Sequence, residues 1–142
     1  VWIKDTLSGT LELQGLTVRD QGSDSFMVSS SLVVNPGDYV VFGKNADSAT
    51  NGGVTVHYEY GGGMSLANGD DEILLEAGSV LVDVIEYDNG STFPDPNGAS
   101  MNLDPTMQDA GLNDQGASWC VATSSFGAGD LGTPGAVNDS CN

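Results

Sequence analysis

The sequence has very few cationic residues. Lysine and arginine total 3 among 142 residues, against 20 aspartates and glutamates, so the formal net charge is −17. A surface of this charge repels phosphate backbones and anionic lipid headgroups, which argues against nucleic acid or a membrane as a partner. The acidity is typical of a highly soluble protein, and it also suits capture of a hard cation such as Ca²⁺.

Residue types that carry catalysis or bind transition metals are also scarce. His57 is the only histidine, and Cys120 and Cys141 are the only cysteines, so a zinc site would lack ligands. No nucleophile motif such as Gly-x-Ser-x-Gly accompanies the histidine. No apolar run approaches the length of a membrane span. The numbered chain begins with Val1 and shows no signal peptide, so we expect it to be a processed product or an excised fragment. We therefore expect no enzymatic activity, no required cofactor and no membrane insertion.

The two cysteines frame a turn-rich tail. An even count in this setting favours a disulfide between Cys120 and Cys141, which would indicate an oxidising, extracellular or cell-surface location. The disulfide would close a loop of about 20 residues. The alternative is a pair of free thiols.

Helical periodicity is absent as well, and what the sequence offers instead is strands and turns. Its 20 glycines separate short runs rich in valine and leucine, which predicts a single all-β domain over residues 1–142. Residues 39–42 read as a buried strand after an Asn-Pro-Gly-Asp turn. Residues 54–60 alternate between apolar and polar, which places His57 on the polar face of a strand, where a catalytic role is not expected.

The stretch "NGDDEILLEAGSVLVDVIEYDN" at 68–89 predicts a β-hairpin with strands at 72–76 and 80–87. Asp70 and Asp71 would then lie just before the first strand, where short polar side chains bond local backbone amides. An EF-hand is excluded because an apolar run occupies the positions of its calcium ligands.

A calcium site of another kind stays open. Loop carboxylates flanked by glycine, asparagine or proline could share a Ca²⁺ ion with backbone carbonyls. The candidate ligands are Asp70, Asp71, Asp88, Asp95 and Asp130. No spacing in the sequence determines which of them converge.

The strand-like runs predict a two-sheet antiparallel sandwich whose core residues come from separate strands. The expected core residues are Leu13, Val40, Phe42, Val56, Leu75, Val82, Ile85 and Trp119.

Several segments occur together in an order that resembles the lamin-tail domain family. They are "LELQGLTVRD", "LVVNPGDYVVF", the hairpin with Asp83 and Tyr87, "FPDPNGASMNLDP" with Gly98, Ser100 and Leu103, and "SWC…GTPGAVN" with Trp119, Thr133, Pro134, Gly135 and Asn138. The family's first strand, which usually precedes these segments, is either absent from the numbered chain, formed by residues 1–4, or supplied by another chain.

This resemblance implies an immunoglobulin-like β-sandwich without catalytic residues, of the kind appended to extracellular or surface proteins. The first hypothesis is therefore a non-catalytic module for adhesion, assembly or protein interaction, with a protein or polysaccharide partner at a cell surface or self-association through an open sheet edge. The alternative is a carbohydrate-binding accessory domain of a secreted enzyme, for which an exposed aromatic row would be needed. The candidate aromatics are Trp2, Tyr58, Tyr60, Trp119 and Phe126.

Overall fold

The structure, a computed structural model, describes residues 1, 3 and 8–142, and this part of the chain confirms the all-β class. Its strands are β1 (Leu11–Glu12), β2 (Leu16–Arg19), β3 (Ser25–Met27), β4 (Val33–Val34), β5 (Phe42–Gly43), β6 (Tyr58–Glu59), β7 (Asp70–Ala77), β8 (Val80–Asp88), β9 (Met101–Leu103), β10 (Trp119–Val121), β11 (Ser125–Phe126) and β12 (Asp130–Leu131). A 3₁₀ turn, η1 (Gly116–Ser118), precedes β10. Within the described residues, no helix has the length and apolar character that crossing a membrane requires.

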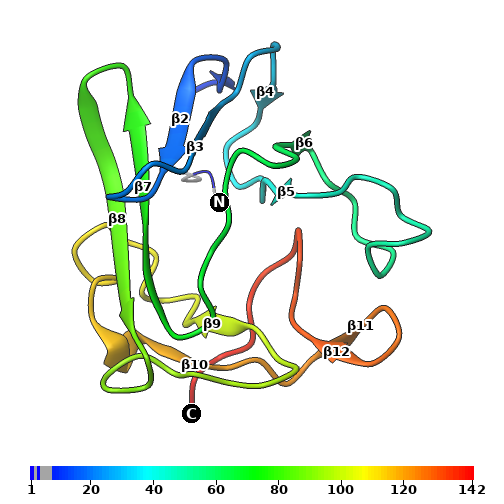
Figure 1. Cartoon of the computed structure of the whole chain (residues 1–142), viewed down its shortest axis with the longest axis vertical. Helices are drawn as coiled ribbons and strands as arrows, with labels where there is room; N and C mark the ends of the chain where they lie inside the picture. The colour runs from blue at the N-terminus through cyan, green and yellow to red at the C-terminus, as the bar shows by residue number, and fades with distance from the viewer. Residues whose placement is uncertain (2, 4–7) are drawn as a thin grey trace.

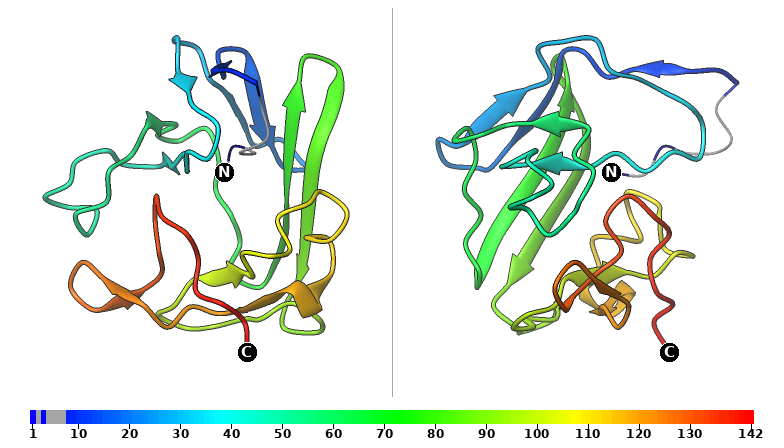
Figure 2. Two further views of the ribbon diagram at one scale, coloured as in Figure 1. Left: turned by 180° about the vertical axis from the view of Figure 1, so that it is seen from behind. Right: turned by 90° about the vertical axis from the view of Figure 1, so that its right-hand side faces the viewer.

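The largest sheet is antiparallel, with strand order β3-β2-β7-β8. Antiparallel pairs also form between β1 and β4, β9 and β10, and β11 and β12, whereas β5 and β6 run parallel. The four-stranded sheet stands along one side of the molecule (Figure 1). Strands β4, β5 and β6 lie across from its upper half, and β9 to β12 lie around its lower end, as the turned views of Figure 2 also show.

The predicted hairpin is present, and both of its strands are longer than predicted. Gly78 and Ser79 alone connect β7 to β8, and Gly78 has φ 62°, as the first central residue of a type II′ turn requires. Asp70 and Asp71, predicted to precede the first strand, are instead its first two residues. Both continue the ladder by pairing with residues of β8, so the edge between strand and loop lies before them.

One hydrophobic cluster lies beside the N-terminus and contains Ile3, Leu13, Val34 and Val40, with Leu32 and Phe42 packed against it. The first residues of the chain are held there by backbone bonds. The Val40 N–H donates to the Val1 carbonyl at 2.6 Å, and the Ile3 N–H donates to the Asp38 carbonyl at 2.8 Å. The three sequence-based alternatives for the family's first strand stay predictions, because residues 2 and 4 lie outside the described residues.

The core prediction is correct for Leu13 and Val40, which are buried, and wrong for Val82, which is 49% exposed. The reason is an irregularity in the β7–β8 register. Leu75 pairs with Asp83 while Glu76 pairs with Leu81, which leaves Val82 as an extra residue on the edge strand. The other predicted core residues are half-buried: Phe42, Val56, Leu75, Ile85 and Trp119.

The burial pattern over 54–60 alternates as predicted, although only Tyr58 and Glu59 form a ladder. The 39–42 segment differs more, because its regular pairing begins only at Phe42.

Aromatic rings from both segments pack beside the four-stranded sheet. Phe26 of β3 lies 4.8 Å from Tyr60 and 5.9 Å from Tyr58, both nearly parallel to it, and 5.6 Å from Phe42, edge-on. Tyr58 and Tyr60 therefore contribute to packing between layers.

The predicted disulfide between Cys120 and Cys141 is present, with an S–S distance of 2.09 Å and Cα atoms 5.6 Å apart. Asn102 of β9 lies beneath it, 2% exposed. Its Nδ2 donates to the Asp139 carbonyl at 2.8 Å, and its Oδ1 accepts from the Asp139 N–H at 3.1 Å. The tail is thus joined to β9 and β10 both covalently and through a buried amide.

Candidate functional site

The five carboxylates predicted as calcium ligands do not share one environment. Asp71 accepts from the Ala67 N–H at 2.6 Å, and Asp88 accepts from the N–H groups of Thr92 and Phe93, each at 3.0 Å. The bonds to Asp88 lower the pKa of that carboxyl. Both carboxylates therefore bond backbone amides close to the open end of the hairpin. The sequence predicted this local bonding as the alternative to cation binding.

Asp95 and Asp130 are the two candidates that the structure brings to one place. Both line a shallow pocket of about 430 Å³, whereas Asp70 lies outside it on β7. Across the described ranges, no three His, Cys, Asp or Glu side chains come together as a set of metal ligands. The calcium site thus stays a prediction that the structure does not test.

The pocket is built from segments that are distant in the sequence. Residues 94–100 form one wall, and Phe126 and the β12 residues Asp130 and Leu131 form the other. Backbone bonds join these walls, because the Ser100 N–H donates to the Leu131 carbonyl at 2.9 Å and the Leu131 N–H donates to the Gly98 carbonyl at 3.4 Å. The turn capped by Asp88 fixes where the first wall begins.

Tyr87 of β8 contributes to the same pocket and is itself 8% exposed. Its hydroxyl donates to the Ala67 carbonyl at 2.6 Å, which holds the 67–68 segment against the sheet. Burial, followed by the charges of Asp71, Glu72 and Asp70, raises the pKa of Tyr87 to about 12. The phenol therefore remains a neutral hydrogen-bond donor at physiological pH.

Phe126 also borders a second depression of about 600 Å³, between residues 52–57 and 124–136. His57 lies along it, exposed as predicted, and its Nδ1 accepts from the Val41 N–H at 3.1 Å. That bond uses the ring nitrogen for backbone pairing. The histidine holds two segments together, consistent with its predicted place on the polar face.

Every aromatic side chain in the described part of the chain is buried or half-buried. None of them therefore forms an open row on which a sugar could stack. Phe126 is intermediate in exposure, and Trp119 donates its Nε1–H to the Asn113 carbonyl at 2.7 Å. Trp2 lies outside the described residues. The carbohydrate-binding alternative gains no support from these positions.

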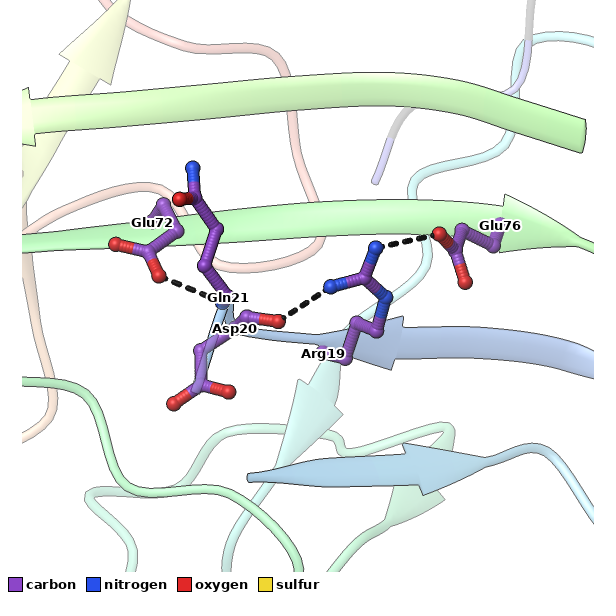
Figure 3. A network of polar contacts seen from close by, with 5 residues as sticks. All are labelled: Arg19, Asp20, Gln21, Glu72 and Glu76. Atoms are coloured by element: carbon purple, nitrogen blue, oxygen red, sulfur yellow. Dashed lines mark hydrogen bonds and ion pairs between the residues drawn. The ribbon is translucent and has the colours of Figure 1, made fainter. Parts of the chain in front are cut away.

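The outer face of the four-stranded sheet, defined as the face turned away from Phe42 and Tyr58, carries a line of polar contacts (Figure 3). Arg19 donates through Nη2 to Glu76 Oε1 at 2.7 Å and through Nη1 to the Asp20 carbonyl at 2.7 Å. Gln21 donates its N–H to Glu72 at 2.6 Å and its side-chain amide to Glu86. The hydrogen bond from the Arg19 guanidinium lowers the pKa of Glu76. Among the five residues drawn in Figure 3, Arg19 is the only cation.

β8 begins with three apolar residues, Val80, Leu81 and Val82, which we term the hairpin patch. These side chains are 63%, 52% and 49% exposed. β8 is also a sheet edge. In the described residues, the backbone between Val80 and Tyr87 bonds only to β7, apart from the Val84 N–H, which donates to the Asp83 carboxylate at 2.9 Å. An exposed apolar run on an edge strand is a typical site for pairing with another chain.

Sequence reasoning missed a buried polar pair behind this strand. Asn113 is 7% exposed and donates through Nδ2 to Asp83 Oδ2 at 2.9 Å. Burial, partly offset by the bonds from Asn113 and Val84, raises the pKa of Asp83. The Asn113 Oδ1 has no hydrogen-bond partner within the described structure. Only contact between β8 and a loop about 30 residues later creates this pair, so no local signal could have indicated it.

The residues that carry the lamin-tail resemblance serve as ties between segments. Asp83 and Trp119 both contact Asn113, and Asn138 donates through Nδ2 to the Leu103 carbonyl at 2.8 Å. Such contacts are structural. Comparison of the chain with protein-family models, curated proteins and solved structures finds no match in any of the three.

Proposed function

We propose that this chain is a non-catalytic extracellular module that binds a protein partner, and that the hairpin patch is a contact surface. The observation that carries the proposal is the exposure of Val80, Leu81 and Val82 together on the edge strand of a protein with net charge −17. Apolar side chains gathered on an otherwise charged surface are typical of interaction sites.

The partner's chemistry follows from the polarity of the outer face. One half of β8 is apolar, and the other half carries Glu86 beside Glu72. A second copy of the chain would bring like charges together, which costs free energy. An extended segment with apolar residues at one end and lysine or arginine at the other complements both halves, and could add to the open edge.

An extracellular location and membership of the lamin-tail family remain parts of this proposal. The disulfide suits an oxidising compartment, and the ordered set of motifs supports the family. An immunoglobulin-like strand arrangement is implied by that resemblance and is proposed on the same basis.

The test uses a synthetic nine-residue peptide in which valine and threonine alternate and the half facing Glu86 carries lysine. Added to the ¹⁵N-labelled protein, it should shift the amide signals of β8 in a saturable manner. A peptide with glutamate in place of lysine should not. Leu81→Ser combined with Val82→Ser should weaken binding, while Val121→Ser combined with Val137→Ser, which alters exposed valines elsewhere, should leave it unchanged. Shifts spread over the whole surface, or none in β8, would overturn the proposal.

A further inference from the structure

The pocket lined by Asp95 and Asp130 contains two carboxylates that do not cap backbone amides. Most loop carboxylates in this protein accept backbone N–H groups, as Asp88 and Asp139 do. Asp95 and Asp130 are exposed, and in the part of the chain that the structure describes neither of their carboxylates has a hydrogen-bond or ion-pair partner, although the Asp130 backbone pairs with Phe126. Two unpaired carboxylates therefore remain available to a ligand at this one depression.

The rest of the lining is mixed, because Asn68, Asn97 and Ser100 add polar groups beside several apolar side chains. Pro94, Pro96, Met101, Phe126 and Leu131 contribute carbon surface around the two carboxylates. A cation that is fully hydrated or bound only through oxygen gains nothing from such walls. A pocket of about 430 Å³ falls within the range of small-ligand sites, which combine apolar walls with a few polar groups.

The pocket is also held in shape before any ligand arrives. The prolines restrict the backbone of the first wall, and the bonds of Ser100 and Leu131 join it to the second. Phe93, at the start of the wall, is 5% exposed and anchors it in the core. A site that is already formed loses little entropy on binding.

We propose that this pocket binds the guanidinium group of an arginine side chain presented by a protein partner. The planar guanidinium offers five donors to carboxylate oxygens and stacks on aromatic rings such as Phe126. Its three-carbon stem packs against apolar surface, as the proline and leucine walls require. Calcium fits less well, because an ion coordinated only by oxygen makes no use of the proline, methionine, phenylalanine and leucine surface in this lining. The pocket lies away from the hairpin patch, so the inference goes beyond the proposed function and is tested separately.

The experiment titrates N-acetyl-arginine amide into the ¹⁵N-labelled full chain at low ionic strength. Saturable shifts should concentrate at the amides of Asp95, Ala99 and Leu131. N-acetyl-norleucine amide, which has a similar stem without the charge, should not produce them. Asp95→Asn combined with Asp130→Asn should weaken arginine binding roughly three- to tenfold, as expected for the loss of two exposed ion pairs.

The matched control is Glu59→Gln combined with Asp114→Asn, which removes the same charge from exposed positions outside the pocket lining. It should bind the probe as the unaltered chain does, and so should the Leu81→Ser, Val82→Ser protein. Equal weakening in the control pair would mean general attraction to an acidic surface and would overturn the inference. Equal shifts with norleucine amide would overturn it too, as would pocket shifts that appear with CaCl₂ and not with the arginine probe. Unchanged chemical shifts outside the pocket verify that each variant is folded.

Discussion

At the scale of single residues, carboxylates act mainly as backbone caps. Asp139 shows this most fully, because it accepts from the N–H groups of Thr123 and Ser124 at 2.7 and 2.8 Å and from both hydroxyls. The hydroxyl of Ser124 and these amide donors hold the pKa of Asp139 far below its ordinary value. Asp104 has the same role, bonding Thr106 and the Cys141 N–H, and its pKa is lowered as well.

Asp139→Asn should lower the melting temperature at pH 7, because an amide oxygen is a weaker acceptor for these donors than a carboxylate. A depressed native pKa contributes stability above the ordinary Asp value of 3.8, and this contribution is lost as pH falls below it. The gap between variant and parent should therefore narrow on acidification below about pH 4. Thermal denaturation followed by circular dichroism from pH 7 to pH 2 measures this gap. Glu59→Gln serves as the control, and a gap that stays constant with pH would contradict the assignment.

At the scale of elements, two devices hold the short strands together. The β7–β8 hairpin supplies the only long ladder among the described strands, and the C-terminal tail closes over β9 and β10 through the disulfide. Strands of two or three residues contribute little by themselves, so covalent and buried polar ties stabilise this end of the molecule.

Replacing both Cys120 and Cys141 with serine should lower the free energy of unfolding by about 3 kcal/mol, since the bond closes a loop of 21 residues in sequence separation. The tail should stay docked in the native state, because the bonds between Asn102 and Asp139 remain. Guanidinium denaturation gives the change in stability, and the Asp139 amide signal reports docking. An unchanged denaturation midpoint would show that the disulfide adds nothing to stability.

At the scale of the whole molecule, the dominant fact is the charge of −17, against which the Arg19–Glu76 ion pair is a small local exception. Self-repulsion on this scale destabilises the compact state and keeps copies of the chain apart. It also strengthens the attraction for a cationic partner, which both proposed surfaces require.

Sodium chloride should raise the melting temperature, because screening reduces the repulsion between exposed carboxylates. Calcium chloride at the same ionic strength tests the predicted cation site, since an ion bound to the native state adds stability by mass action. Differential scanning calorimetry in the two salts, with magnesium chloride for comparison, provides the measurement. A melting temperature insensitive to sodium chloride would contradict the repulsion argument, and equal rises in all salts would contradict the calcium site.

The local pattern of the sequence determined the hairpin, its glycine turn and the alternation over 54–60. Each follows from interactions within a few residues, namely the period-two pleat and the φ freedom of Gly78. The cysteine pair was predictable for a related reason, because with two cysteines only one internal disulfide can form.

The tertiary structure alone decided which side chains are exposed and which carboxylates are free. Val82 has the composition of a core residue, yet the register shift beside Leu75 places it in solvent. Asp88 and Asp95 look alike in sequence, but only the fold shows that Asp88 caps a turn while Asp95 lines the same pocket as Asp130. These outcomes depend on contacts between residues tens of positions apart, and packing sets such contacts through the whole chain at once, so no local pattern records them.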